Sequence, residues 1–200
     1  MKKLYYFTVV ILSIFLLCAC NKGNETSELD LKFSEHFGST MDEYLKNTNT
    51  SQEAIKESLP GTGVWQFTEK VAYKEIQFTK LLHVDTANNI ICGGGYQCVI
   101  ENPDESTYEL IYSIKKDIVN QFGEPTTYAG LDNVLSNMKN FSDIAASNGA
   151  VERWTVESED SIEIPAYEGV KMVEEIELEI ICLNGKANIK IVRWLRADEN

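Results

Sequence analysis

Near its C-terminus the chain alternates between charged and apolar residues. From Glu174 to Cys182 almost every second side chain is apolar, and a period of two places the two sets on opposite faces of a β-strand. One face then carries the acidic row Glu175, Glu177 and Glu179. Asn184-Gly185 predicts a two-residue hairpin turn, because both turn positions require a positive φ. That turn sets Glu179 opposite Lys190 and places Trp194 beside the acidic row, on the outer face.

Other stretches have the helical spacing of three and four residues. The clearest runs from Thr107 to Phe122, where a wide apolar stripe is formed by Leu110, Ile111, Ile114 and Ile118. Ser106 and Glu109 predict a capping box at its start, and Gly123 predicts its end. Shorter helical segments are predicted over 33–45, with a break at Gly38, over 50–59, and from Leu131 to just before Asn148-Gly149, with Leu59 among the residues that face inward.

Strand-like alternation begins at Trp65 and Phe67, and 71–84 is predicted as one long bent strand or two short ones. Further strands are predicted over 90–100 and 151–157. Gly93-Gly94-Gly95 interrupts the middle segment, which indicates a bulge, a tight bend or the close approach of another group. The order along the chain is helices, strands, helices, strands, with turns rather than helices between strands. The sequence therefore predicts an α+β fold with a mainly antiparallel sheet and helices packed on one face.

The N-terminus has the pattern of an export signal. Lys2 and Lys3 precede an apolar run that ends at Leu17-Cys18-Ala19-Cys20, and a polar stretch follows. The run from Leu4 to Ala19 is shorter than the ~20 residues of a membrane-spanning helix. The tetrad resembles the bacterial lipobox. This resemblance implies that the signal is cut before Cys20 and that Cys20 carries the lipid.

The resemblance divides the chain into a signal peptide (1–19), a polar tether (20–30) and a single domain (31–200). It implies a lipid-anchored protein of the cell envelope, and Asn21 favours the outer membrane if the bacterium has one. An ordinary secretory signal and a single N-terminal transmembrane helix are the alternatives.

Charge narrows the classes of partner. Without the signal, 16 basic residues face 31 acidic ones, which gives a net charge of −15. This balance argues against nucleic acid and against an anionic membrane surface, because both bind through Lys and Arg. It suits a basic protein partner, or a solvated surface with no specific partner.

Three cysteines follow the lipobox: Cys92, Cys98 and Cys182. An exported protein can form disulfides, and an odd number leaves at least one thiol free. Cys92 could pair with Cys98 across a turn at the three glycines, or Cys98 with Cys182 across a sheet. Three buried free thiols are the remaining alternative.

The two halves of the chain have a similar element order. Residues 50–61 and 106–125 each combine a capped helix with a Pro/Gly stop, and a Trp-bearing segment and strands follow. This order, with the Phe122-Gly123-Glu124-Pro125 stop, resembles the helix–sheet repeats of small periplasmic inhibitors of the β-lactamase-inhibitor-protein type and of assembly lipoproteins. The resemblance concerns element order, and it transfers no functional residue.

Catalytic motifs are sparse. His36 and His83 have no partner at zinc-ligand spacing, and the glycine run lacks the Lys-Ser/Thr of a phosphate loop. A Cys–His nucleophile would need His83 beside Cys92 or Cys98. No catalytic residue, metal site or cofactor is therefore predicted, although abundant carboxylates leave a glycosidase-like pair open.

Three functions follow from these patterns. The first is a binding or accessory lipoprotein of the cell envelope, with its membrane contact at Cys20 and a protein partner. The second is an inhibitor or immunity-type protein that binds a basic partner, and the third is a carboxylate-dependent hydrolase. The candidate partner contact is formed by Glu175, Glu177, Glu179 and Trp194, because acidic groups around an apolar anchor are typical of protein interfaces.

Overall fold

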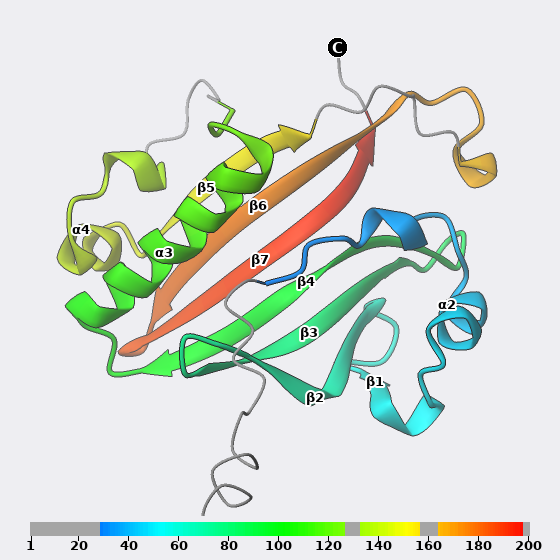
Figure 1. Ribbon diagram of the computed structural model, residues 1–200, viewed down its shortest axis with the longest axis horizontal. Helices are drawn as coiled ribbons and strands as arrows, with labels where there is room; N and C mark the ends of the chain where they lie inside the picture. Colours follow the sequence, from blue (N-terminus) through cyan, green and yellow to red (C-terminus); the bar gives the residue numbers. More distant parts are fainter. Residues whose placement is uncertain (1–28, 127–132, 157–163, 198–200) are drawn as a thin grey trace, which may run out of the picture.

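Seven strands form one antiparallel sheet in the computed structural model, which describes residues 29–126, 133–156 and 164–197 (Figure 1). The strands are β1 (Ile55–Glu57), β2 (Val64–Tyr73), β3 (Ile76–Asp85), β4 (Ile90–Glu101), β5 (Gly149–Val156), β6 (Met172–Leu183) and β7 (Lys186–Ala197). Their order across the sheet is β1-β2-β3-β4-β7-β6-β5. The chain thus makes two meanders, β1–β4 and β5–β7, whose last strands pair in the middle of the sheet.

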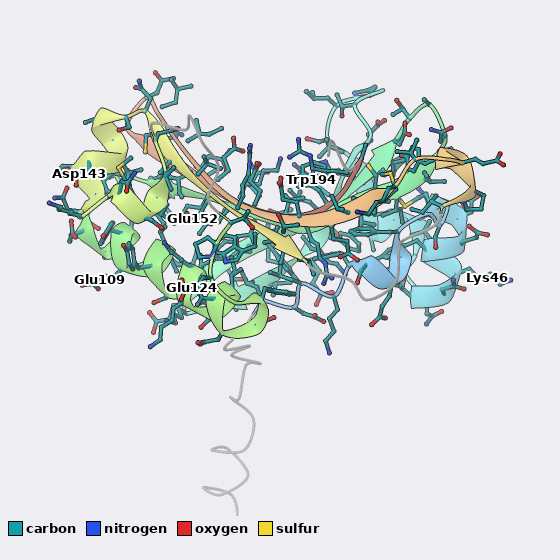
Figure 2. All side chains as sticks on the ribbon, turned by 90° about the horizontal axis from the view of Figure 1, so that it is seen from above. Lys46, Glu109, Glu124, Asp143, Glu152 and Trp194 are labelled. Atoms are coloured by element: carbon teal, nitrogen blue, oxygen red, sulfur yellow. The ribbon has the colours of Figure 1, made fainter. Side chains whose placement is uncertain are left out.

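The helices lie against one face of this sheet. They are α2 (Met41–Thr48), α3 (Glu105–Phe122) and α4 (Phe141–Ala146), with short 3₁₀ turns η1 (Ser34–His36), η2 (Gln52–Ala54), η3 (Leu135–Asn137) and η4 (Pro165–Tyr167). Figure 2 shows that the sheet is curved, with α2, α3 and α4 on its convex side and Trp194 on its concave side. The predicted α+β fold with a mainly antiparallel sheet is confirmed.

The core lies between the sheet and α3. All four residues of the predicted stripe on α3 are buried, and they share one core cluster with the inward residues of β6 and β7. On these strands Ile176, Leu178, Ile189 and Ile191 have no exposed surface. Each such side chain contributes about 1.5–3 kcal/mol through burial, so this layer fixes the position of the central strands.

The C-terminal hairpin has the predicted register. Asn184 and Gly185 have φ values of 54° and 72°, and Glu179 pairs with Lys190. The same register sets Trp194 opposite Glu175, on the face away from the helices. The prediction succeeded because a two-residue turn and a period of two leave a single register that buries the apolar set.

The helix predicted over 50–59 is wrong, and the helix predicted from Leu131 to before Asn148-Gly149 is correct only in its last part, α4. The segment 50–59 forms only the turn η2 before Ile55 enters β1, and Leu59 is 65% exposed instead of facing inward. Residues 131 and 132 lie outside the described residues. After them, Val134 makes a parallel bridge to Val151 on β5, and η3 and α4 follow. Pairing with distant strands outweighs local helical spacing in both segments.

The N-terminal cap of α3 also differs from the prediction. Asp104 is the N-cap, and Thr107 completes the capping box, instead of Ser106 and Glu109. Asp104 accepts a hydrogen bond from the backbone N–H of Ser106 at 2.9 Å. Helix α2, rather than the segment 50–61, precedes the first meander, so the proposed internal match of 50–61 with 106–125 is wrong.

The described chain joins the core at Leu29. Leu29 and Leu31 are buried beside Ile114 and Ile118 of α3. The lipobox tetrad and Cys20 lie outside the described residues. In the part of the chain that the structure describes, no helix combines the length and apolar character needed to cross a membrane.

Candidate functional site

The concave side of the sheet carries no helix, and we call it the open face. It consists of the even-numbered residues of β7 from Lys186 to Arg196 and the residues paired with them across β2–β6. Trp194 is partly exposed on this face. Three exposed apolar residues lie at the hairpin end of the face: Val99 at 52%, Ile181 at 43% and Leu183 at 67% exposure. The open face therefore offers apolar surface that no part of the described chain covers.

The three glycines of β4 let aromatic rings lie directly on the strand. A Cβ at Gly93 would stand 2.7 Å from the indole of Trp194 on the open face. A Cβ at Gly94 would stand 2.1 Å from the ring of Phe33 on the helical face. Gly95 lies so close to β7 that its Cβ would meet the Ile191 carbonyl oxygen at 2.0 Å. The predicted close approach of another group is confirmed, and the pairing of β3 with β4 also shifts register at the start of the run, between His83–Gly93 and Val84–Ile91.

His83 lies beside Trp194 on the open face. It pairs with Gly93, and its imidazole contacts the indole with ring centroids 4.3 Å apart. The side chain is buried, and its Nε2 has no hydrogen-bond partner. Burial, with a smaller effect of the nearby Lys190, lowers the pKa of His83 to about 4. The imidazole is therefore neutral at physiological pH.

Lys190 also contacts the indole of Trp194. Its ammonium is 5.2 Å from the centroid of the Trp194 ring, within the range of a cation–π contact. No carboxylate of the described residues lies within 4.0 Å of this ammonium, although Glu179 is opposite it in the register. The indole of Trp194 thus contacts both a neutral, buried imidazole and a cation without an ion-pair partner in the described chain.

The acidic row does not present three free carboxylates. Glu175 is 5% exposed and pairs with Arg196 at 2.6 Å, while Glu177 pairs with Arg153 at 2.7 Å. Glu179 is partly exposed. The paired positions of the open face carry five basic residues (Lys70, Arg153, Lys186, Lys190 and Arg196) and four acidic ones (Glu101, Glu175, Glu177 and Glu179). The expected negative face is therefore nearly neutral, and the acidic excess of the chain lies elsewhere.

Neither candidate disulfide forms, and all three cysteines are free. Cys92 and Cys98 lie on the same strand, β4, six residues and thus about 20 Å apart. Cys98 and Cys182 lie on β4 and β6 with β7 between them, a separation of roughly 10 Å, whereas a disulfide needs Cα atoms within ~7 Å. The turn expected at the glycines does not exist, because they continue the strand.

The thiols are not activated as nucleophiles. Cys92 donates a hydrogen bond to the backbone carbonyl of His83 at 3.6 Å, rather than to its imidazole. Burial raises the pKa of Cys92, and it raises the pKa of Cys98 to about 12. A thiolate is the reactive form, so the Cys–His arrangement weighed from the sequence lacks the required electrostatics.

A second polar cluster lies between α3 and β5. Lys115 contacts Glu152 at 2.8 Å and Ser136 at 2.6 Å, and the Ser136 hydroxyl donates to the same carboxylate at 2.6 Å. Glu152 is buried, and Figure 2 shows it between the sheet and the helices. Because the lysine donates to both partners, it cannot also accept the serine proton. The cluster satisfies a buried carboxylate, and the other buried carboxylate of the helical face, Glu174, pairs with Arg193.

Sequence reasoning identified Trp194 but missed its neighbours as a group. His83 was considered only with cysteines, and Lys190 only as the partner of Glu179. The available signal was Gly93, because a glycine within a strand indicates that a ring or backbone approaches closely. Which ring approaches depends on the pairing of β4 with β7, and that pairing joins residues about a hundred positions apart.

Comparisons with protein-family models, with curated proteins and with solved structures find no match for this chain. Within the described ranges, no group of three or more His, Cys, Asp or Glu side chains is placed to hold a metal ion.

Proposed function

We propose that this chain is a lipid-anchored binding protein of the cell envelope whose open face contacts a protein partner. The observation that carries the proposal is the open face itself. It is a wide curved surface without a covering helix, with a partly exposed Trp194 and exposed Val99, Ile181 and Leu183. Aromatic anchors surrounded by paired charges are typical of protein interfaces.

The position of Leu29 supports this arrangement. Leu29 is buried on the helical face, so the preceding chain joins the domain on the side opposite the open face. Cys20 and Leu29 are nine positions apart, and this stretch spans at most about 30 Å when extended. A lipid at Cys20 would hold the domain near the membrane, and the open face would be directed away from the attachment point.

The charge of the open face bears on the choice between partners. An inhibitor or immunity-type protein for a basic partner would need an acidic contact surface, and Arg153 and Arg196 neutralise the row that the sequence suggested. The carboxylate-dependent hydrolase has no specific support, because the buried Glu152 and Glu174 are each used in an ion pair. A general envelope binding protein is therefore the best-supported of the three functions.

Site-specific photo-crosslinking in the native envelope tests the proposal. A photoreactive phenylalanine derivative replaces Gln97 on the open face, or Lys116 on the exposed side of α3 as the matched control. We expect one protein to be crosslinked from Gln97 and not from Lys116, and Trp194→Ala to reduce its yield strongly. Equal crosslinking from both positions, or none from Gln97, would contradict the proposal.

A further inference from the structure

We propose that His83, Lys190 and Trp194 form a carboxylate-binding site on the open face, and that the group it takes is an Asp or Glu side chain of the protein partner. The inference rests on the proposed function, since it names the chemistry that the partner brings. It comes from three side chains that meet across β3 and β7, with Gly93 of β4 between them.

The first observation is the unpartnered nitrogen of His83. The side chain is 7% exposed, and its Nε2 has no hydrogen-bond partner within residues 29–126, 133–156 and 164–197. Leaving such a group unpaired is unfavourable, and native proteins usually satisfy it with protein, water or ligand. The indole of Trp194 lies against the imidazole and is itself partly exposed. In the proposed site this side chain rotates away, and a ligand oxygen reaches the imidazole.

The second observation is the ammonium of Lys190, which has no carboxylate partner among the described residues. It lies over the same indole, 5.2 Å from the ring centroid, and it is close enough to His83 to affect its protonation. The two arginines of the open face are already engaged with Glu175 and Glu177. Lys190 is therefore a cation whose charge is available to an incoming group, next to a nitrogen that lacks a hydrogen bond.

A carboxylate fits this pair better than other anions. One cation and one nitrogen match a group with a single negative charge and two oxygens. A phosphate carries nearly two charges, and it would face the glutamates of β6 with only one free cation nearby. The apolar stem of Asp or Glu would also contact the indole, which a free inorganic anion cannot do.

The groups around His83 determine how binding depends on pH. Burial opposes the protonation of His83, and so does Lys190 on β7. Glu175 on β6 is opposite Trp194 in the register, but its carboxylate is paired with Arg196 and Arg153. Cys92 on β4 bonds the His83 carbonyl, and β2 contributes Val64. A carboxylate placed between Lys190 and the imidazole would favour the imidazolium. Binding should then take up a proton and become tighter as the pH falls from 7.5 to 5.5.

The test uses the full mature chain labelled with 5-fluorotryptophan, which gives one ¹⁹F NMR signal per tryptophan. Trp194→Phe assigns the signal of Trp194. The probe is a blocked pentapeptide with one central Glu, and the same peptide with Gln is its control. We expect the Glu peptide to shift the Trp194 signal saturably, with an affinity about tenfold lower in Lys190→Gln. Lys70→Gln, which removes a charge elsewhere on the open face, should leave the affinity within about twofold.

His83→Asn separates recognition from folding. It should remove the pH dependence of the Glu-peptide affinity while the other two tryptophan signals keep their positions. An equal response to the Gln peptide, or an unchanged affinity in Lys190→Gln, would overturn the site.

The outcome is independent of the crosslinking experiment. A partner captured from Gln97 whose yield is insensitive to Lys190→Gln would refute the carboxylate site and leave the proposed function standing. Saturable binding of the Glu peptide with no crosslinked partner would support the carboxylate site and contradict the proposed function.

Discussion

Alanine at the three consecutive glycines of β4 should produce three different results. The neighbours that a new Cβ would meet differ in kind: a half-buried indole at Gly93, a buried ring at Gly94 and a backbone carbonyl at Gly95. The chemical change is the same at each position. The differences in the free energy of unfolding therefore report how far each neighbour is able to move.

Gly94→Ala should cost about 3 kcal/mol. The Cβ would stand 2.1 Å from Phe33 Cδ1, whereas ordinary contacts begin near 3.4 Å, so the ring must shift by more than 1 Å. Phe33 is 3% exposed and packs edge-on against Tyr96 with ring centroids 5.7 Å apart, which leaves it little room. Overpacking of this kind costs ~1–3 kcal/mol and occasionally more, which corresponds to a fall in Tm of roughly 10 °C for a domain of this size.

Gly93→Ala should cost about 1 kcal/mol or less, because Trp194 lies on the open face and can swing away. Gly95→Ala should prevent folding, since the clash at 2.0 Å is with the Ile191 carbonyl and would separate β4 from β7. Urea unfolding followed by far-UV circular dichroism measures all three. If Gly93→Ala destabilises as much as Gly94→Ala, Trp194 is held as rigidly as a core residue and the open face is not free to rearrange.

Three further predictions concern the anchor, the hairpin and pH. Cys20→Ala should abolish incorporation of labelled fatty acid and block maturation; continued labelling would contradict the lipobox assignment. Gly185→Val should lower the free energy of unfolding by about 1–3 kcal/mol, because φ is 72° and nothing contacts the new side chain, so only backbone strain acts. An unchanged Tm would show that the turn tolerates a β-branched residue. The folded-state pKa of His83, about 4, lies below the unfolded value of 6.5. The contribution of His83 to the free energy of unfolding is therefore complete above pH 6.5 and is lost as the pH falls to 4. In urea titrations across this range, the wild-type protein should lose roughly 3 kcal/mol more stability than His83→Phe. If the free energies of unfolding of the two proteins change in parallel with pH, the pH dependence does not come from His83.

The elements that the sequence predicted well are those whose signals are local. The stripe on α3 and the hairpin at Asn184-Gly185 each combine a long periodic pattern with a stop or turn residue. Their burial follows from the same pattern, so local preference and tertiary packing agree. The fold class could be derived from these elements and from the turns between strands.

The errors occurred where distant pairing decides the outcome. Ile55 is drawn into β1 by Phe67, and Val134 pairs with Val151, although both segments have helical spacing. The prediction of a negatively charged face at the acidic row was wrong for the same reason. Its position on the outer face was correct, but Arg153 comes from β5 and lies across the strand from Glu177. A single sequence does not reveal which cation a glutamate meets on a neighbouring strand.

The contrast between two tryptophans supports a binding role for the open face. Trp154 is 1% exposed, and its indole N–H donates to the Gly123 carbonyl at 3.1 Å, as expected of a core residue. Trp194 is partly exposed and rests on a strand glycine, a residue that weakens strands by about 0.5–1 kcal/mol relative to Ala. The imidazole that it contacts has a ring nitrogen, Nε2, with no hydrogen-bond partner among the described residues. Each of these features is unfavourable for stability alone. Together they describe a surface whose polar groups and aromatic ring are completed by a partner.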